Sequence, residues 1–302
     1  MRTTGSVTWD ILPTVPRGAP VDGFRLAYDR AGSGPPVVAL HGWPGSRRDY
    51  REVAARLGGE VDLVVPDLRG FGASDRHDAA PEAYAAAGQA ASILGLIDEL
   101  ALERPVLVGY DVGSRVAQTV ARERPDAVRA LVISPPLPGV GDRVLSVDAQ
   151  REFWYQPFHR LALSTDLIDG RRDAVATYLR HFWEHWSGPG WSPPADELDA
   201  LVDDYARPGA FAASIGWYRA GAGTLAAALA ERAPEPEDRL AVPTTVLWPT
   251  EDPLFPVAWS DRIDAFLAHA RLRVLDGVGH FVPLQAPDEI AGAIRAATGT
   301  SA

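Results

Sequence analysis

The sequence predicts an α/β fold in which a mostly parallel, doubly wound sheet carries an inserted helical cap. Two observations lead to this fold class. Short, nearly continuous apolar runs alternate with helical patterns towards both ends of the 302-residue chain, which is typical of strands that are covered on both faces. Between these two parts, over roughly 100 residues, the alternation stops and helix-like sequence without clear strands takes its place.

The elements follow from these runs in order. Apolar, β-favouring runs predict early strands at residues 24–31, 35–42, 61–68, 105–111 and 127–134. The intervening helices are predicted at residues 49–57, 81–100 and 113–122. After the interruption, strands are predicted at residues 244–252 and 271–277, and helices at residues 257–268 and 287–297.

The interruption defines the expected domain organisation. Residues 1–135 and 241–302 are predicted to form one core, and residues 136–240 are predicted to form the cap. The cap holds five of the nine tryptophans, so we expect it to pack on the sheet and to line a binding pocket with part of these rings.

Composition excludes several kinds of chemistry. The chain has no cysteine and all 29 basic residues are arginine, which excludes thiol catalysis, disulfides, Schiff-base lysines and P-loops. A net charge of −11 without a basic block argues against nucleic-acid binding. Neither a membrane span of ~20 apolar residues nor a signal peptide is evident. We expect a cytoplasmic protein, either a monomer or a homodimer.

The segment VLVGYDVGSRVA, residues 106–117, predicts a sharp turn from a strand into a helix. Such a turn raises its central side chain, here Asp111, above the end of the sheet, as in the G-x-S-x-G nucleophile elbow. Taken alone the pattern is weak evidence, because Gly-rich turns that contain Asp are common between strands and helices.

Three further motifs lie at predicted strand ends on the same edge of the sheet, where open α/β folds place their sites. HGWPGS, residues 41–46, follows an early strand, and TEDPLFP places Glu251 and Asp252 after a late one. GVGHFVP places His280 after the last strand. The order of Asp111, an acid and His280 is the order of a nucleophile, acid and histidine triad.

A carboxylate in the nucleophile position predicts attack on a saturated carbon that bears a leaving group. Aspartate is ionised at neutral pH and attacks without a base, which would leave an alkyl ester on Asp111. His280, oriented by Asp252, would then activate water against that ester. The N–H groups of Trp43 and Val112 are predicted to stabilise the oxyanion. The sequence therefore predicts an enzyme that opens a C–O or C–halogen bond without a cofactor.

These motifs, together with PDLRGFGASD, resemble those of the epoxide hydrolase branch of the α/β-hydrolase superfamily. The resemblance implies an α/β-hydrolase fold and an epoxide that is opened to a vicinal diol. It also implies a cis bond before Pro44. Family members use two cap tyrosines to protonate the leaving oxygen, and SIGWYRAG and REFWYQPFHR imply Tyr218 and Tyr155, with Tyr178 and Tyr205 in reserve.

Two alternatives stay open. A hydrolytic dehalogenase would use the same aspartate, but haloalkane dehalogenases usually have Trp where this chain has Val112. Fluoroacetate dehalogenases have an arginine at that position and a second one further along, of which this chain has Arg115. The other alternative is a non-catalytic small-molecule receptor on the same fold, although no triad residue is missing.

The remaining expectations concern the pocket and metals. Trp154, Trp183 and Trp217, with Pro44, are predicted to line an apolar substrate pocket. The segment RHFWEHW places two histidines four residues apart, a spacing that can hold zinc, but no third ligand is evident. We therefore predict no metal site, and a small apolar epoxide and water as the reactants.

Overall fold

A computed structural model of the chain describes residues 15–223 and 225–300. Most of the N-terminal segment considered for a signal peptide lies outside these residues. One sheet of seven strands has the order β1-β3-β2-β4-β5-β6-β7. The strands are β1 (Tyr28–Ala31), β2 (Pro36–Leu40), β3 (Asp62–Pro66), β4 (Val106–Gly109), β5 (Ala130–Ile133), β6 (Thr244–Pro249) and β7 (Ala270–Leu275). Strand β1 is antiparallel to β3 and the other pairs are parallel, which confirms the predicted sheet.

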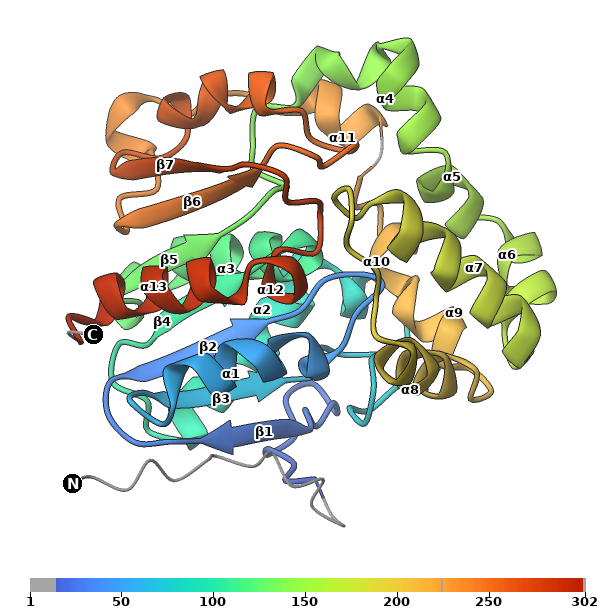
Figure 1. Cartoon of the computed structure of the whole chain (residues 1–302), viewed down its shortest axis with the longest axis horizontal. Coiled ribbons are helices and arrows are strands. Elements are labelled where there is room, and N and C mark those ends of the chain that lie inside the picture. Colours follow the sequence, from blue (N-terminus) through green and yellow to red (C-terminus); the bar gives the residue numbers. More distant parts are fainter. Residues whose placement is uncertain (1–14, 224, 301–302) are drawn as a thin grey trace.

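Helices cover both faces of the sheet (Figure 1). Helices α1 (Arg51–Leu57) and α13 (Pro287–Thr298) pack together on one face, while α2 (Ala86–Glu99) and α3 (Asp111–Glu123) pack together on the other. The short α12 (Val282–Gln285) contacts α13. Every residue of β4 and β5 is buried as a result, which explains their uninterrupted apolar sequence.

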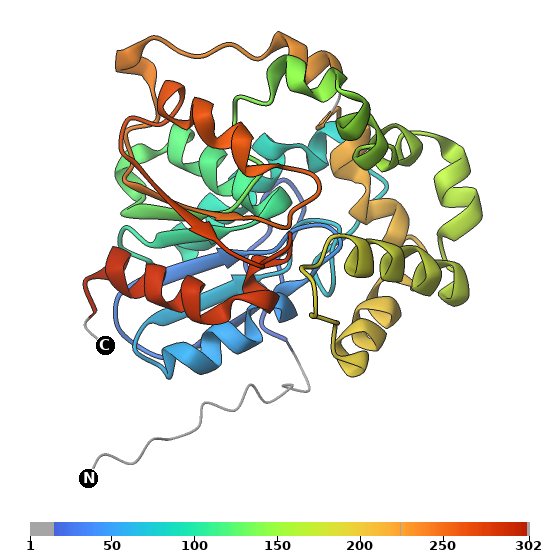
Figure 2. The same ribbon diagram turned by 45° about the horizontal axis from the view of Figure 1, so that its top comes forward.

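The segment between β5 and β6 is helical in the structure. Figures 1 and 2 show these inserted helices beyond the ends of the strands that point towards them. They are α4 (Val147–Glu152), α5 (Tyr155–His159), α6 (Ala162–Ile168), α7 (Arg172–His185), α8 (Ala195–Tyr205), α9 (Ala210–Ser214), α10 (Gly216–Arg219) and α11 (Leu225–Ala230). All lie within the range predicted for the cap.

Several predicted elements need correction. The strand predicted at residues 24–31 is confined to β1, because Phe24 and Ala27 instead form isolated bridges with Val21 and Arg17. The helix predicted at residues 81–100 is divided, since Ala85 is extended and separates a 3-10 turn from α2. The helix predicted at residues 257–268 is a 3-10 helix, Val257–Ala265.

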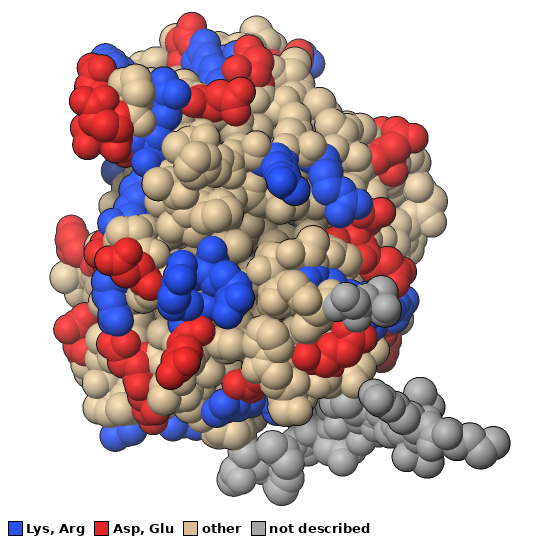
Figure 3. Space-filling model, turned by 90° about the vertical axis from the view of Figure 1, so that its left-hand side faces the viewer, with Lys and Arg blue, Asp and Glu red and all other residues tan. Residues whose placement is uncertain are grey.

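The described surface is consistent with the charge pattern of the sequence. The face away from the inserted helices carries acidic and basic side chains interspersed with uncharged residues (Figure 3). Among the helices that the structure describes, none combines the length and apolar character that crossing a membrane requires.

The contact that positions the elbow lies between α3 and the end of β2. A Cβ atom added at Gly113 would lie 2.1 Å from the carbonyl oxygen of Leu40 and 2.7 Å from that of His41. Both obstacles are backbone atoms, which cannot turn aside as a side chain does. Glycine at this position therefore lets α3 begin directly against the segment that follows β2.

Replacing Gly113 tests this contact. We expect Gly113→Ala to lower the free energy of unfolding by about 1–3 kcal/mol or more, the usual cost of forcing extra atoms into a packed core. Gly292→Ala in α13 is the matched control, because nothing lies within 4 Å of its added Cβ, and it should stabilise by roughly 0.5–1 kcal/mol. Urea unfolding measures both, and equal stability of the two variants would contradict the packing argument.

Candidate active site

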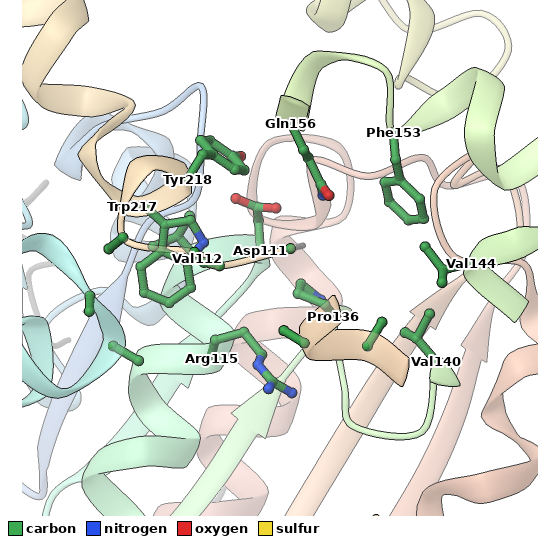
Figure 4. Close-up of a pocket in the computed structure, with 18 of the residues that line it drawn as sticks. Asp111, Val112, Arg115, Pro136, Val140, Val144, Phe153, Gln156, Trp217 and Tyr218 are labelled. Atoms are coloured by element: carbon green, nitrogen blue, oxygen red, sulfur yellow. The ribbon is translucent and has the colours of Figure 1, made fainter. Parts of the chain in front are cut away.

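Asp111 lies at the turn between β4 and α3 in a conformation that side chains rarely adopt. Its φ is 48°, in the left-handed region that costs free energy for residues other than glycine. Its backbone N–H donates to the carbonyl of Pro135 at 3.0 Å. Its carboxylate points into a cavity (Figure 4). This is the strained elbow that the sequence predicts.

The carboxylate of Asp111 accepts a hydrogen bond from the loop after β2. The backbone N–H of Trp43 donates to Asp111 Oδ1 at 2.8 Å. The bond between Trp43 and Pro44 is cis. Val112, the other predicted oxyanion residue, lines the cavity beside Asp111. The Trp43 N–H therefore contacts one oxygen of the Asp111 carboxylate directly.

His280 connects two carboxylates from different strand ends. Its Nδ1 lies 2.9 Å from Asp252 Oδ2, and its Nε2 lies 3.4 Å from Asp111 Oδ2. The other oxygen of Asp252 accepts the N–H of Leu254 at 2.8 Å. Glu251, the neighbouring acid, is exposed. Of the two acids after β6, the structure therefore brings Asp252 to the histidine.

The charges around His280 favour its protonated form. Burial lowers the pKa of His280, but the charges of Asp252 and Asp111 and the hydrogen bonds to them outweigh burial and raise it to about 10. The imidazole is almost fully excluded from solvent. The two carboxylates thus favour the imidazolium form of His280 in the free protein.

Tyr155 and Tyr218 line the same cavity as Asp111, and Figure 4 shows Tyr218 near its carboxylate. The two tyrosine rings meet edge to face with 5.5 Å between centroids. Burial and the negative charge of Asp111 raise the pKa of both hydroxyls well above the ordinary value. Both side chains therefore remain protonated and can donate a proton or a hydrogen bond.

The two reserve tyrosines have other partners. The hydroxyl of Tyr178 lies 3.0 Å from His159 Nε2. The hydroxyl of Tyr205 donates to the carbonyl of Gly45 and accepts from its N–H. Neither side chain lines the cavity.

The cavity has a volume of about 400 Å³ and a mostly apolar lining. Five large apolar side chains of this lining come from the core and the inserted helices: Leu137, Val144, Phe153, Trp217 and Phe255. The polar lining includes Arg115, Gln156 and Glu231 besides the candidate catalytic residues. Apart from Trp217, these side chains were not among the predicted site residues. For Val144, Phe153, Gln156 and Glu231 the reason is that their positions depend on how the inserted segment packs on the core.

The predicted tryptophans take three different positions. Trp217 lines the cavity, as expected. Neither Trp183 nor Pro44 lines the cavity, so both predictions need correction: Trp183 is buried, and its Nε1–H donates to the carbonyl of Pro44 at 3.2 Å. Trp154 is 42% exposed and stacks on Phe182, so its placement in the pocket needs correction. Trp154 is the residue immediately before α5.

The loop at residues 41–46 is hydrogen-bonded to three of the inserted helices. Besides the bond from Trp183 on α7, the Nε1–H of Trp43 donates to Ser214 on α9 at 3.3 Å. Tyr205 on α8 makes the two bonds to Gly45. The loop that contacts Asp111 is thus also held by the inserted helices.

The two histidines at metal-compatible spacing contact each other and a glutamate. The rings of His181 and His185 stack with 5.7 Å between centroids, and His185 Nε2 lies 2.7 Å from Glu152 Oε2. No group of three potential ligands suited to a metal ion occurs within residues 15–223 and 225–300.

The chain matches a known family. Residues 35–287 match the alpha/beta hydrolase fold family, and the chain therefore belongs to that family. This confirms the family resemblance inferred from the motifs.

Relatives within the family include several epoxide hydrolases. Soluble epoxide hydrolase of Corynebacterium sp. is 34% identical over 40% of this chain and 42% of that protein. Epoxide hydrolase A of Mycobacterium tuberculosis is 28% identical over 92% of this chain and 97% of that protein. A fluoroacetate dehalogenase of Burkholderia sp. is 29% identical over 64% of each chain. The solved structure of epoxide hydrolase CorEH has a TM-score of 0.79 and 25% identity, covering 95% of this chain and 98% of that one.

The raised pKa of His280 predicts a pH dependence of stability. The pKa is about 10 in the folded protein and ~6.5 in an unfolded chain. The contribution of His280 is therefore full below pH ~6.5 and is lost as the pH rises towards 10, by up to about 1.4 kcal/mol per pH unit. We expect wild-type protein to lose more stability than His280→Gln over this window. Urea unfolding from pH 6 to 10 measures the difference, and parallel curves would contradict the assignment.

Proposed function

We propose that the protein is a cofactor-independent epoxide hydrolase that opens an apolar epoxide to a vicinal diol. The observation that carries this proposal is the arrangement around one cavity of an anionic nucleophile and neutral proton donors. Asp111 is paired with His280, while Tyr155 and Tyr218 line the same space. The similarity to named epoxide hydrolases supports the same activity.

In the first half-reaction a carboxylate oxygen of Asp111 attacks an epoxide carbon. The bond from that carbon to the epoxide oxygen breaks, which forms an alkyl ester on Asp111 and an alkoxide. Tyr218, assisted by Tyr155, donates a proton to this alkoxide and becomes a tyrosinate. The oxygen held by the Trp43 N–H becomes the ester carbonyl, because the other oxygen of the carboxylate makes the attack.

In the second half-reaction His280 Nε2 takes a proton from water, and the hydroxide adds to the ester carbon. The Trp43 N–H, with that of Val112, stabilises the resulting oxyanion. Collapse expels the diol oxygen and restores the carboxylate of Asp111. Before this step the imidazolium proton of His280 has returned the tyrosinate to tyrosine, and the proton of the added hydroxide passes to the diol oxygen as it leaves. The proton taken from water restores the imidazolium, so that the net reaction consumes one epoxide and one water.

The charges around His280 explain how it can change from an acid to a base between the two half-reactions. In the free protein two carboxylates favour the imidazolium, which cannot accept a proton. Alkylation turns Asp111 into a neutral ester and removes one of these charges, so that the pKa of His280 falls. His280 can then give its proton to the Tyr218 tyrosinate, and it becomes a base after the ester has formed, when a base is required.

The apolar cavity lining supports a neutral, aryl- or alkyl-substituted epoxide. Burial of such a substituent against Trp217, Phe153 and Phe255 stabilises the complex by roughly 25 cal/mol per Å² of apolar surface. A small charged acid would gain little from these walls.

A hydrolytic dehalogenase is the alternative within the same chemistry. Its strongest support is Arg115, a cation in the cavity lining. The guanidinium lies 3.9 Å from Glu231, whose other oxygen accepts the N–H of Gly139 at 2.6 Å. A carboxylate substrate would have to compete with this resident glutamate, and the two tyrosines would have no leaving oxygen to protonate. These contacts favour the epoxide.

Trapping the intermediate tests the proposed mechanism. We expect His280→Gln to accumulate an adduct on the peptide that contains Asp111, because ester hydrolysis needs the base while alkylation does not. Mass spectrometry after incubation with aryl and alkyl epoxides would detect it. Absence of an adduct in that variant, with substrate bound, would exclude the covalent mechanism.

Two neighbouring acids and a substrate panel provide the controls. Asp252→Asn should slow ester hydrolysis by misorienting His280, whereas Glu251→Gln should behave like the wild type. Fluoroacetate and a haloalkane belong in the panel, since release of halide would support the dehalogenase. Binding of all candidates without turnover would support the third possibility, a small-molecule receptor.

Removing the phenolic proton tests the role of Tyr218. We expect Tyr218→Phe to slow alkylation by roughly 10²-fold, the usual scale for a lost general acid, without slowing hydrolysis of an ester already formed. Tyr178→Phe is the matched control, because Tyr178 belongs to the same aromatic cluster but bonds His159. Pre-steady-state kinetics separates the two steps, and unchanged alkylation in Tyr218→Phe would mean that another group protonates the leaving oxygen.

A further inference from the structure

A buried acid and tyrosine lie beneath the loop that contacts Asp111. Tyr110, the residue directly before Asp111, donates its hydroxyl proton to Asp49 Oδ2 at 2.5 Å. The carboxyl of Asp49 also accepts the backbone N–H of Ser46, at 3.2 Å and 3.3 Å from its two oxygens. Both side chains are at most 3% exposed. The proposed reaction assigns neither of them a role.

The loop is packed directly against this pair. A Cβ added at Gly45 would lie 2.3 Å from Asp49 Oδ2 and 2.6 Å from the Tyr110 hydroxyl. A Cβ added at Gly42 would lie 2.6 Å from the Cβ of Asp111 and 2.8 Å from the Tyr110 ring. The backbone on both sides of Trp43 therefore rests on the pair and the elbow, without side chains between them.

Asp49 is buried, and it forms no ion pair with a side chain in the part of the chain that the structure describes. Burial raises the pKa of Asp49 to about 8, opposed by the hydrogen bonds from Tyr110 and Ser46 and reinforced by the charges of Glu197 and Asp67. An acid in such surroundings depends on its hydrogen-bond donors. Loss of the Tyr110 hydroxyl would leave the Asp49 carboxyl without its shortest bond, and the adjacent loop would have to adjust.

We infer that Asp49 and Tyr110 are positioning residues, which hold the Trp43 N–H on Asp111 Oδ1 for hydrolysis of the alkyl-enzyme ester. This inference rests on the proposed function and assigns the pair to one of its two half-reactions. The pair joins the elbow to the loop from below, through Tyr110 next to Asp111 and through Asp49 bound to Ser46.

The two half-reactions depend differently on the Trp43 N–H. During alkylation negative charge leaves the Asp111 carboxylate, so a donor on that group gives no additional stabilisation to the transition state. During ester hydrolysis negative charge returns to the held oxygen, and the same donor stabilises it. A displaced donor should therefore slow hydrolysis and leave alkylation unchanged, whereas general loss of structure would lower both rates.

The test compares Tyr110→Phe with Tyr50→Phe in the full-length protein. Tyr110→Phe keeps the bonds between Asp49 and Ser46 that cap the following 3-10 helix, so it removes only the link to the elbow. Tyr50 is equally buried, but its hydroxyl donates to the carbonyl of Leu40 at 2.9 Å and does not join the loop to the elbow. Rapid-quench mass spectrometry with an epoxide that alkylates His280→Gln gives the rates of ester formation and hydrolysis.

We expect Tyr110→Phe to slow ester hydrolysis by roughly tenfold or more, less than the ~10²–10³ of deleting an oxyanion donor outright, with alkylation changed less than about twofold. The covalent species should accumulate in Tyr110→Phe and not in Tyr50→Phe. Asp49→Ala should show the same selective loss, and the double variant should be no slower than the slower single variant, because the two residues act as one unit.

Two results would overturn the inference. One is ester hydrolysis in Tyr110→Phe at the wild-type rate, and the other is an equal fall of both rates. If His280→Gln forms no adduct, the proposed function fails and the inference fails with it. If the adduct forms and Tyr110→Phe still hydrolyses normally, the positioning role fails while the proposed function stands.

Discussion

The site depends on the close backbone contact between the start of α3 and the end of β2. Gly113 permits this contact, since any side chain there would meet the carbonyl groups of Leu40 and His41. The approach brings Asp111 within hydrogen-bond distance of the Trp43 N–H, although the two residues are 68 positions apart in the chain. A slightly wider spacing would separate the carboxylate from its donor. The geometry of two backbones thus determines the position of the reactive group.

Three charged side chains lie close to this contact and are shielded from water. Asp111, Asp252 and His280 are all nearly excluded from solvent, and their mutual attraction offsets the cost of removing each charge from water. The protonation of His280 depends on both neighbouring carboxylates, so it changes when one of them is neutralised. The apolar walls contribute to the chemistry as well as to substrate binding, because they keep the local dielectric constant low.

The sequence predicted the sheet and the residues at its strand ends because both depend on local patterns. Apolar runs of strand length mark β4 and β5, and a turn-forming motif marks Asp111. The chemistry of the acids and histidine then identified Asp252 and His280 as candidates. The lining of the cavity was harder to predict: Trp154 and Trp217 each precede a tyrosine of interest, yet one is exposed and the other is buried. Trp154 precedes α5 and Trp217 lies in α10, and helices as short as these have no periodic pattern from which the buried side can be predicted. The contact between Tyr110 and Asp49 joins residues far apart in sequence and has no motif of its own.

The bonds from α7, α8 and α9 to the loop at residues 41–46 affect how the molecule can move. If the inserted helices swung outward as one body, they would pull on Pro44, Gly45 and the indole of Trp43, and the oxygen-binding donor would move with them. The inserted helices therefore cannot swing wide open while the Trp43 N–H stays on the Asp111 carboxylate. Molecules that reach the cavity therefore have to enter and leave by movements that keep these bonds in place. Exchange of substrate and product can then proceed while the reactive centre remains assembled between turnovers.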